Sequence, residues 1–188
     1  VDFLIGAGGA NIMDSAKVIA YGYYHDKLLD VTTPDGKHLP VILIPTYPSS
    51  GSEYNTYSMI KGNDEFSFCA LTVPDYALLV PKYSLSLGPE MTAYASLVTF
   101  IQLATFVITD TNPVSYDQGI AVMKNVLKAS YDLKNNPGDL TARGIILYSS
   151  SVAASGTIGI SRNYEFFFNF YHVDTMVELA LGSTYRKT

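Results

Sequence analysis

The residues of this chain whose type and spacing most clearly suggest a binding function are three glycines. They stand between an apolar run and a helical pattern. Gly6, Gly8 and Gly9 follow the apolar residues 1–5 and precede a helix expected to begin near Asn11. A turn of this kind exposes backbone N–H groups at the positive end of a helix and lets a ligand approach closely, which suits phosphate. The spacing matches neither the Gly-x-Gly-x-x-Gly fingerprint nor the P-loop, so an ordinary strand-to-helix turn is the alternative.

A second polar segment, residues 45–53, directly follows the apolar run 39–44. Its hydroxyl side chains include Thr46, Ser50 and Ser52. A continuous apolar run is typical of a strand buried on both faces of a parallel sheet, and open α/β sheets bind ligands beyond the carboxyl ends of their strands. The segment is therefore a candidate ligand loop, with a plain surface turn as the alternative.

The elements that must position these residues are a parallel sheet and one helix. The pattern predicts a helix over residues 11–24, with Asn11 as its N-cap, and a further buried strand over 76–80. A short hairpin is predicted from residues 57–61 and 66–71. The apolar face expected for the helix consists of Ile12, Ala16, Ile19, Ala20 and Tyr23.

After residue 88 the pattern becomes helical. The predicted helices span residues 89–108, 116–135, 139–156 and 163–181, with Asp139 as an N-cap. We therefore expect an α/β part at residues 1–88, a partial dinucleotide-binding domain, and a partial all-helical domain at residues 89–188.

Composition excludes several other classes of protein. Hydrophobic residues make up 48% of the 188 residues and charged residues 15%, which indicates a globular chain with a core. Acidic residues outnumber basic ones by 17 to 12, with no basic cluster, so no nucleic-acid partner is expected. The single cysteine precludes an intramolecular disulfide and fits a reducing, cytoplasmic location. The apolar run 94–108 is short for a membrane span and is interpreted as a buried core helix.

Three stretches taken together resemble the iron-containing alcohol dehydrogenases, most closely their butanol-dehydrogenase-like branch. They are residues 2–14 with Lys17, residues 39–53 with Asn55, and residues 74–93. The resemblance implies a partial dehydroquinate-synthase-like fold, with a nucleotide-binding α/β domain followed by a helical domain that carries a metal. It also implies hydride transfer between NAD or NADP and a small alcohol or aldehyde, with iron or zinc polarising the oxygen.

The resemblance assigns cofactor contacts residue by residue. Asp14 takes the family position near the nicotinamide. Residues 8–11 form the implied phosphate cradle, and the hydroxyls of Thr46, Ser50 and Ser52 in the polar segment contribute the other contacts. The implied cofactor-binding residues are Gly8, Gly9, Ala10, Asn11, Asp14, Thr46, Ser50 and Ser52.

The family's metal ligands are not matched. An Asp and a His four residues apart on one helix face correspond here to Val98 and Gln102, and a third ligand, a His, corresponds to Asn169. A valine cannot coordinate, and an amide is a poor ligand for iron or zinc. His172 is a weak candidate ligand, and an ordinary hydrogen-bonded helix residue is its preferred interpretation.

Three functions stay open at this point. The chain is a piece of a divergent alcohol dehydrogenase, a catalytically inactive relative that binds cofactor or serves as a structural subunit, or an α/β module for a phosphorylated metabolite. The last class includes sugar-phosphate cyclases. We also expect sequence to be missing at both ends, leaving apolar faces that favour a homo-oligomer.

Overall fold

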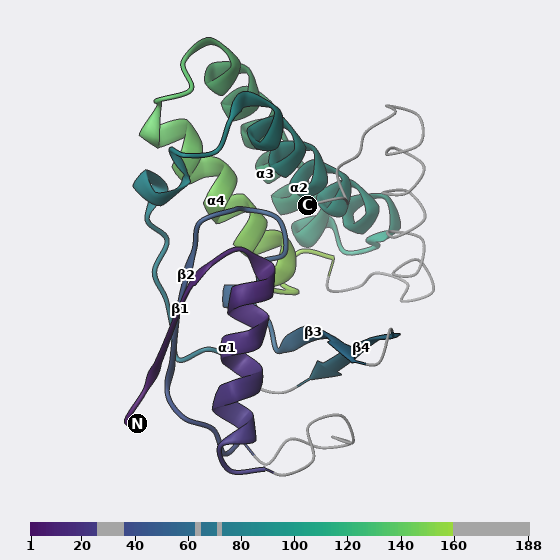
Figure 1. Ribbon diagram of the computed structural model, residues 1–188. Helices are drawn as coiled ribbons and strands as arrows, with labels where there is room; N and C mark the ends of the chain where they lie inside the picture. Colours follow the sequence, from purple (N-terminus) through teal and green to yellow (C-terminus); the bar gives the residue numbers. More distant parts are fainter. Residues whose placement is uncertain (26–35, 63–64, 71–72, 160–188) are drawn as a thin grey trace.

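The computed structural model describes residues 1–25, 36–62, 65–70 and 73–159 (Figure 1). The helix predicted at residues 163–181, with Asn169 and His172, lies outside these residues. The α/β elements in chain order are β1 (Leu4–Gly8), α1 (Ala10–Gly22), β2 (Val41–Pro45), the 3-10 turn η1 (Ser52–Tyr54), β3 (Tyr57–Gly62), β4 (Glu65–Ala70) and β5 (Tyr76–Ala77). The 3-10 turn η2 (Pro81–Ser84) then leads to α2 (Pro89–Thr109), α3 (Pro113–Asn135) and α4 (Leu140–Ala154).

The expected parallel sheet is present in the order β1-β2-β5, with Gly8 opposite Pro45 in the register. Its glycine turn and its polar loop therefore leave the sheet at the same edge. The strand predicted at residues 76–80 is wrong in length and burial, because β5 has two residues and Tyr76 is 65% exposed. Within the described residues β5 pairs with β2 alone, so it forms an edge of the sheet instead of a buried strand.

Helix α1 is confirmed, but it begins one residue earlier than predicted, and the predicted N-cap is wrong. Gly9 is the N-cap, with φ −78° and ψ −173°, and no side chain caps the helix. The predicted buried face is also wrong in part, since Ile12, Ile19 and Tyr23 are exposed. The residues that turn toward the sheet and η1 are Met13, Asp14, Ala16, Lys17, Ala20 and Tyr21. Helix α1 has two partly apolar faces, and the face that packs against the sheet is the one that becomes buried.

The hairpin predicted near residue 62 is confirmed as the antiparallel pair β3 and β4. Figure 1 shows it projecting beside α1. The backbone N–H of Met59 in β3 donates to Asp14 Oδ2 at 2.9 Å, so the hairpin is tied to α1 by a side chain.

Three of the four helices predicted after residue 88 are confirmed as α2, α3 and α4. Asp139 caps α4 as predicted, accepting from the N–H groups of Thr141 and Ala142. Helix α3 begins earlier than expected because Asn112 caps it and Pro113 occupies its first position. By length and composition alone, α2 is the one helix among the described residues that could cross a membrane, and part of it is buried against its neighbours.

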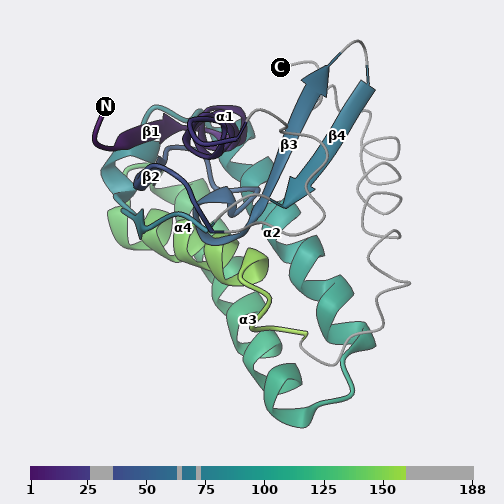
Figure 2. The same ribbon diagram turned by 90° about the horizontal axis from the view of Figure 1, so that it is seen from below.

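Two hydrophobic clusters of buried residues lie in the described part of the chain. One joins α1 to the sheet through residues such as Met13 and Leu43, and the other joins α2, α3 and α4 around Leu103 and Ile146. Figure 2 shows α2 and α3 running side by side away from the sheet. The clusters fall on either side of residue 88, and we keep residues 1–88 and 89–188 as a proposed division into domains.

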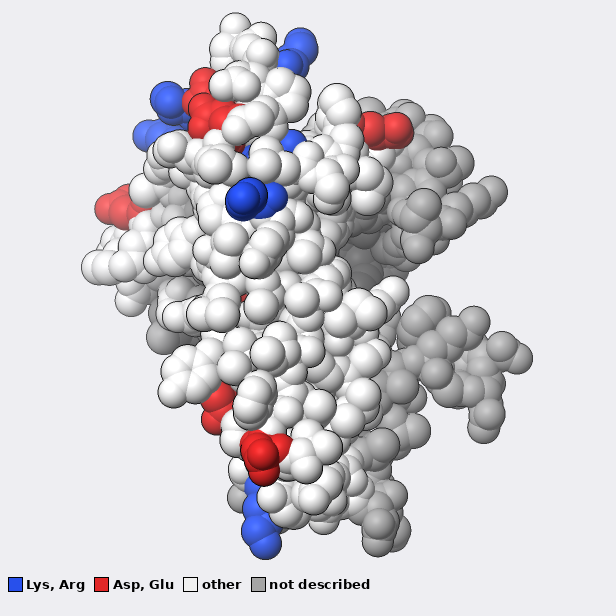
Figure 3. Space-filling model, turned by 60° about the vertical axis from the view of Figure 1, so that its left-hand side comes forward, with Lys and Arg blue, Asp and Glu red and all other residues white. Residues whose placement is uncertain are grey.

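The surface carries few charges. On the face shown in Figure 3, Lys and Arg side chains are scattered among uncharged residues and form no continuous basic patch. This agrees with the net charge of −5 for the sequence.

Candidate functional site

The N-terminus of α1 is open. Ile12 and Met13 donate their backbone N–H groups to the Gly9 carbonyl at 3.1 and 3.2 Å. Within the described part of the chain, the backbone N–H groups of Ala10 and Asn11 have no recorded acceptor. The first turn also holds no acidic side chain. Two free donors and the positive helix end form a site for one anionic group.

The three glycines of the turn differ in what surrounds them. A methyl group built on Gly6 would lie 2.9 Å from Ala16 Cβ, and one on Gly8 would lie 2.8 Å from Ile12 Cβ. These two glycines let β1 pack closely on α1. A methyl group on Gly9 would meet only Tyr47 Cβ, at 3.9 Å, so space lies open in front of it. Of the three, Gly9 is the one whose missing side chain leaves room for a ligand.

The polar loop after β2 starts beside this turn. Thr46 donates its backbone N–H to the Gly8 carbonyl at 3.0 Å. Thr46 and Ser50 are both partly exposed, and the Ser50 hydroxyl accepts from the N–H of Ser52 at 3.2 Å. The structure therefore brings Thr46 next to the glycine turn, as the strand order requires, and leaves two of the three predicted hydroxyl residues accessible.

Asp14 and Ser52 lie in a buried network instead. The Ser52 hydroxyl donates to Asp14 Oδ1 at 2.5 Å, and the other carboxylate oxygen accepts from Met59 N–H. Ser52 is almost fully buried. In this structure both carboxylate oxygens of Asp14 are engaged within the chain.

Lys17 is the centre of the same network and is fully buried. Its ammonium donates to the Ser52 carbonyl at 3.0 Å, to Asn55 Oδ1 at 3.2 Å and to the Tyr57 carbonyl. It also lies 3.5 Å from Asp14 Oδ1 as an ion pair. A buried charge is tolerated when it is paired and hydrogen-bonded, and here the price of burial is offset by carbonyl and carboxylate oxygens. The network joins α1 to the loop and to β3.

Glu53, the middle residue of η1, points the opposite way, toward α4. It is 3% exposed, and Ser151 of α4 donates its hydroxyl to Glu53 Oε1 at 2.5 Å. Burial raises the pKa of the Glu53 carboxyl above its ordinary 4.5. The hydrogen bond from Ser151, a backbone hydrogen bond and the charge of Lys17 each oppose that rise.

The raised pKa of Glu53 predicts a pH-dependent stability. The folded chain holds this proton to a higher pH than the unfolded chain does, so the stabilisation is complete below about pH 4.5 and is lost as the pH rises through the folded pKa. Glu53→Gln keeps the volume and the hydrogen-bonding oxygen but cannot ionise. We expect urea unfolding from about pH 4 to about pH 8 to show a flatter pH dependence for the variant, by at most ~1.4 kcal/mol per pH unit.

The control for this prediction is Glu90→Gln, the same chemical change at an exposed residue in the first turn of α2. Its pH profile should parallel that of the unchanged chain. Identical profiles for the unchanged chain and Glu53→Gln would contradict the assignment of the proton to Glu53.

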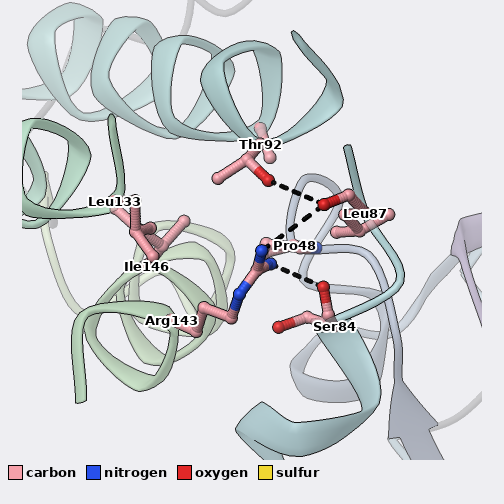
Figure 4. Close-up of a pocket in the computed structure, with 8 residues that line it drawn as sticks. Pro48, Ser84, Leu87, Thr92, Leu133, Arg143 and Ile146 are labelled. Carbon is pink, nitrogen blue, oxygen red and sulfur yellow. Dashed lines mark hydrogen bonds between the residues drawn. The ribbon is translucent and has the colours of Figure 1, made fainter. Parts of the chain in front are cut away.

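A small cavity lies where η2 and the loop after β2 meet helices α2, α3 and α4. Arg143 lines it and donates from Nε to the Pro137 carbonyl at 2.8 Å. Its Nη1 donates to the Ser84 carbonyl at 2.5 Å and its Nη2 to the Leu87 carbonyl at 3.4 Å (Figure 4). Burial lowers the pKa of the guanidinium. The cavity is lined by Pro48, Ser84, Leu87, Thr92, Ala95, Leu133, Arg143 and Ile146. No predicted cofactor residue lines it, and Arg143 there anchors the link between η2 and α2.

The residues present do not fit a metal ion in the described part of the chain. Val98 and Gln102 lie four residues apart on α2, where neither side chain supplies a carboxylate, thiolate or imidazole. Among the described residues there is no group of three or more His, Cys, Asp or Glu that could hold an ion. Asn169 and His172 lie outside these residues, so the loss of the metal site stays a prediction.

The sequence alone did not identify Lys17, Glu53 and Ser151 as residues whose hydrogen bonds hold the site in place. A signal for Lys17 was present, because it lies four residues from both Met13 and Tyr21 and so shares their buried face. No local signal pairs Glu53 with Ser151, which is 98 residues away in the sequence.

Comparison with known proteins connects this geometry to one family. The family model "Iron-containing alcohol dehydrogenase" matches residues 1–81, which include every predicted cofactor residue. Among curated proteins, the chain is 26% identical over 170 residues to probable NADH-dependent butanol dehydrogenase 2 of Bacillus subtilis, covering 84% of this chain and 43% of that protein.

Solved structures share the fold. The NADH-dependent butanol dehydrogenase A of Thermotoga maritima matches with a TM-score of 0.77 and 22% identity, over 87% of this chain and 43% of that one. Sulfoacetaldehyde reductase of Bifidobacterium kashiwanohense, solved in complex with NAD⁺, matches with a TM-score of 0.73 and 22% identity. The match covers 84% of this chain and 45% of that one. The chain thus spans less than half the length of the relatives it matches.

Proposed function

We propose, on the premise that this chain is a partial member of the iron-containing alcohol dehydrogenase family, that it holds the pyrophosphate of NAD or NADP for an alcohol or aldehyde oxidoreductase. The observation that carries the proposal is the open N-terminus of α1, where Gly9 leaves space and two backbone N–H groups lack acceptors in the described structure. A relative named for NADH and a fold neighbour bound to NAD⁺ support the choice of ligand.

The proposal gives the predicted residues two kinds of role. Ala10 and Asn11 bind phosphate oxygens through backbone N–H groups, and Gly9 lets the pyrophosphate approach, while Gly8 keeps the turn packed against α1. Thr46 and Ser50 offer hydroxyls beside it. Asp14 and Ser52, which are buried and bonded to each other, hold the loop in place, and contact of Asp14 with the nicotinamide requires one of its oxygens to be released.

A bound nicotinamide ring would supply or accept the hydride. The contribution of the described residues is binding and orientation: the cradle fixes the diphosphate, and the Lys17 network fixes the loop that follows β2. Orientation of this kind lowers a barrier because the entropy cost is met on binding.

A second candidate function is cofactor binding without metal-assisted chemistry, as an inactive or structural subunit. It is favoured by Val98, which has no ligand atom at a position where the resemblance implies one. Phosphorylated-metabolite binding by the same cradle is the third. In all three we propose a homo-oligomer, supported by exposed apolar residues such as Ile5 of β1. The proposed reducing, cytoplasmic location rests on the single cysteine.

An NADH fluorescence titration of the purified chain, with elemental analysis of the same sample, separates these functions. Saturable NADH binding with stoichiometric iron or zinc supports an active oxidoreductase and rejects the inactive subunit. NADH binding without metal supports the second candidate. Absence of NADH binding contradicts the proposal and leaves phosphate-metabolite binding.

A further inference from the structure

We infer that η1 links helix α4 to the polar loop that follows β2, residues 45–53, and that α4 thereby fixes the conformation of this loop. Glu53 and Ser151 act as positioning residues. The inference rests on the proposed function for the identity of the ligand. Its structural core is that two neighbouring residues of η1, Ser52 and Glu53, are bonded in opposite directions to helices that lie far apart in the sequence.

On one side, η1 is held by α1, the helix whose N-terminus forms the cradle. The Ser52 hydroxyl donates to Asp14, and Lys17 donates to the Ser52 carbonyl at 3.0 Å. Asp14 and Lys17 lie about one and about two turns after Ala10 and Asn11 on the same helix. Any displacement of the N-terminal half of α1 therefore acts directly on η1.

On the other side, η1 is held by α4. Ser151 donates to Glu53, and both residues are buried, at 1% and 3% exposure. Gly51, just before η1, has φ +56°, and a methyl group on it would overlap Ala154 Cβ and come within 2.9 Å of the Ser150 carbonyl. The loop backbone thus rests against α4 without space between them. Close packing of this kind transmits displacement instead of absorbing it.

The serine next to Ser151 provides a matched control within the same helix. Ser150 is as deeply buried as Ser151, but its hydroxyl has no hydrogen-bond partner in the described structure. Ser150→Ala and Ser151→Ala remove the same atom from neighbouring positions, and only the second breaks the link to Glu53.

Hydrogen–deuterium exchange of the 188-residue chain tests the link without any ligand. We expect Ser151→Ala to speed exchange of the loop amides at residues 46–55 by about tenfold, the equivalent of one buried hydrogen bond, and Ser150→Ala to leave it unchanged. Ser151→Thr, which keeps the hydroxyl, should restore slow exchange. Equal effects of Ser150→Ala and Ser151→Ala, or no effect of either, would overturn the link.

If Ser151→Ala does not fold, the pair Glu53→Gln and Glu53→Ala decides the matter. Gln keeps an oxygen that can accept from Ser151, so its loop should exchange as slowly as that of the unchanged chain, while Ala should speed exchange. Fast exchange in both variants would show that the hydrogen bond does not hold the loop.

Exchange measured with added NADH tests whether the link positions the loop for the cofactor. Added NADH should slow exchange in α4 around Ser151 in the unchanged chain but not in Ser151→Ala, and NADH should bind the variant several-fold more weakly. NADH that binds the unchanged chain yet leaves α4 exchange unaffected overturns the positioning role. If NADH does not bind at all, the proposed function fails, while the ligand-free exchange still decides whether the link exists.

Discussion

Replacing Gly9 by valine is expected to weaken NADH binding by at least about a hundredfold, or ~2.7 kcal/mol, while the chain stays folded. The isopropyl group would occupy the open space before the N–H groups of Ala10 and Asn11, where the pyrophosphate is proposed to lie. Because Gly9 has negative φ and its added Cβ meets only Tyr47 Cβ at 3.9 Å, the chain itself accommodates the side chain. Fluorescence titration measures the affinity, and circular dichroism checks the fold.

Gly88 provides the matched control for this experiment. It is the N-cap of α2, also lacks a side-chain cap, and has nothing within 4 Å of an added Cβ. We expect Gly88→Val and Gly9→Val each to lower the free energy of unfolding by about 1 kcal/mol or less. Gly88→Val should leave the NADH affinity unchanged. Undiminished binding by Gly9→Val would exclude the cradle as the cofactor site.

Replacing Lys17 by methionine is expected to lower the free energy of unfolding by about 3–5 kcal/mol. Methionine fills most of the volume but leaves the carboxylate of Asp14 buried without its positive partner. The carbonyls of Ser52 and Tyr57 lose their donor as well. Since small domains are stable by only about 5–15 kcal/mol, a loss of this size brings the chain close to unfolding. Urea denaturation monitored by circular dichroism measures it.

Lys128→Met is the corresponding control at an exposed ion pair. Lys128 donates to Asp132 at 3.0 Å one turn along α3, and its side chain is 75% exposed. Exposed pairs of this spacing contribute about 0.3–0.5 kcal/mol, so this variant should unfold almost as the unchanged chain does. Similar losses for the two lysines would contradict the central role of Lys17.

Local chemistry allowed the main elements of the site to be predicted. The glycine turn, the apolar strand and the polar loop each carry their own signal, and parallel pairing of β1 with β2 places the turn and the loop at one edge. The Asp139 cap of α4 was likewise readable from a single residue and its neighbours.

The supporting contacts could not be predicted because they depend on packing between distant parts of the chain. Gly6 and Gly8 look like ligand-binding glycines in the sequence, yet the structure uses them to bring α1 against β1. Asp14 reads as a cofactor residue, but its oxygens are engaged by Ser52 and Met59, from segments whose approach follows from the fold alone. The exposed face of α1 shows the same limit, since Ile12 is apolar and still 52% exposed.

The most direct test of the cradle is an amide chemical-shift titration of the isotope-labelled chain with NADH. The account predicts that the largest ¹H–¹⁵N shifts occur at Ala10 and Asn11, whose N–H groups gain phosphate oxygens as acceptors, with smaller shifts at Thr46. Inorganic pyrophosphate should move the same two amides. Saturable binding with unchanged shifts at Ala10 and Asn11 would contradict the account.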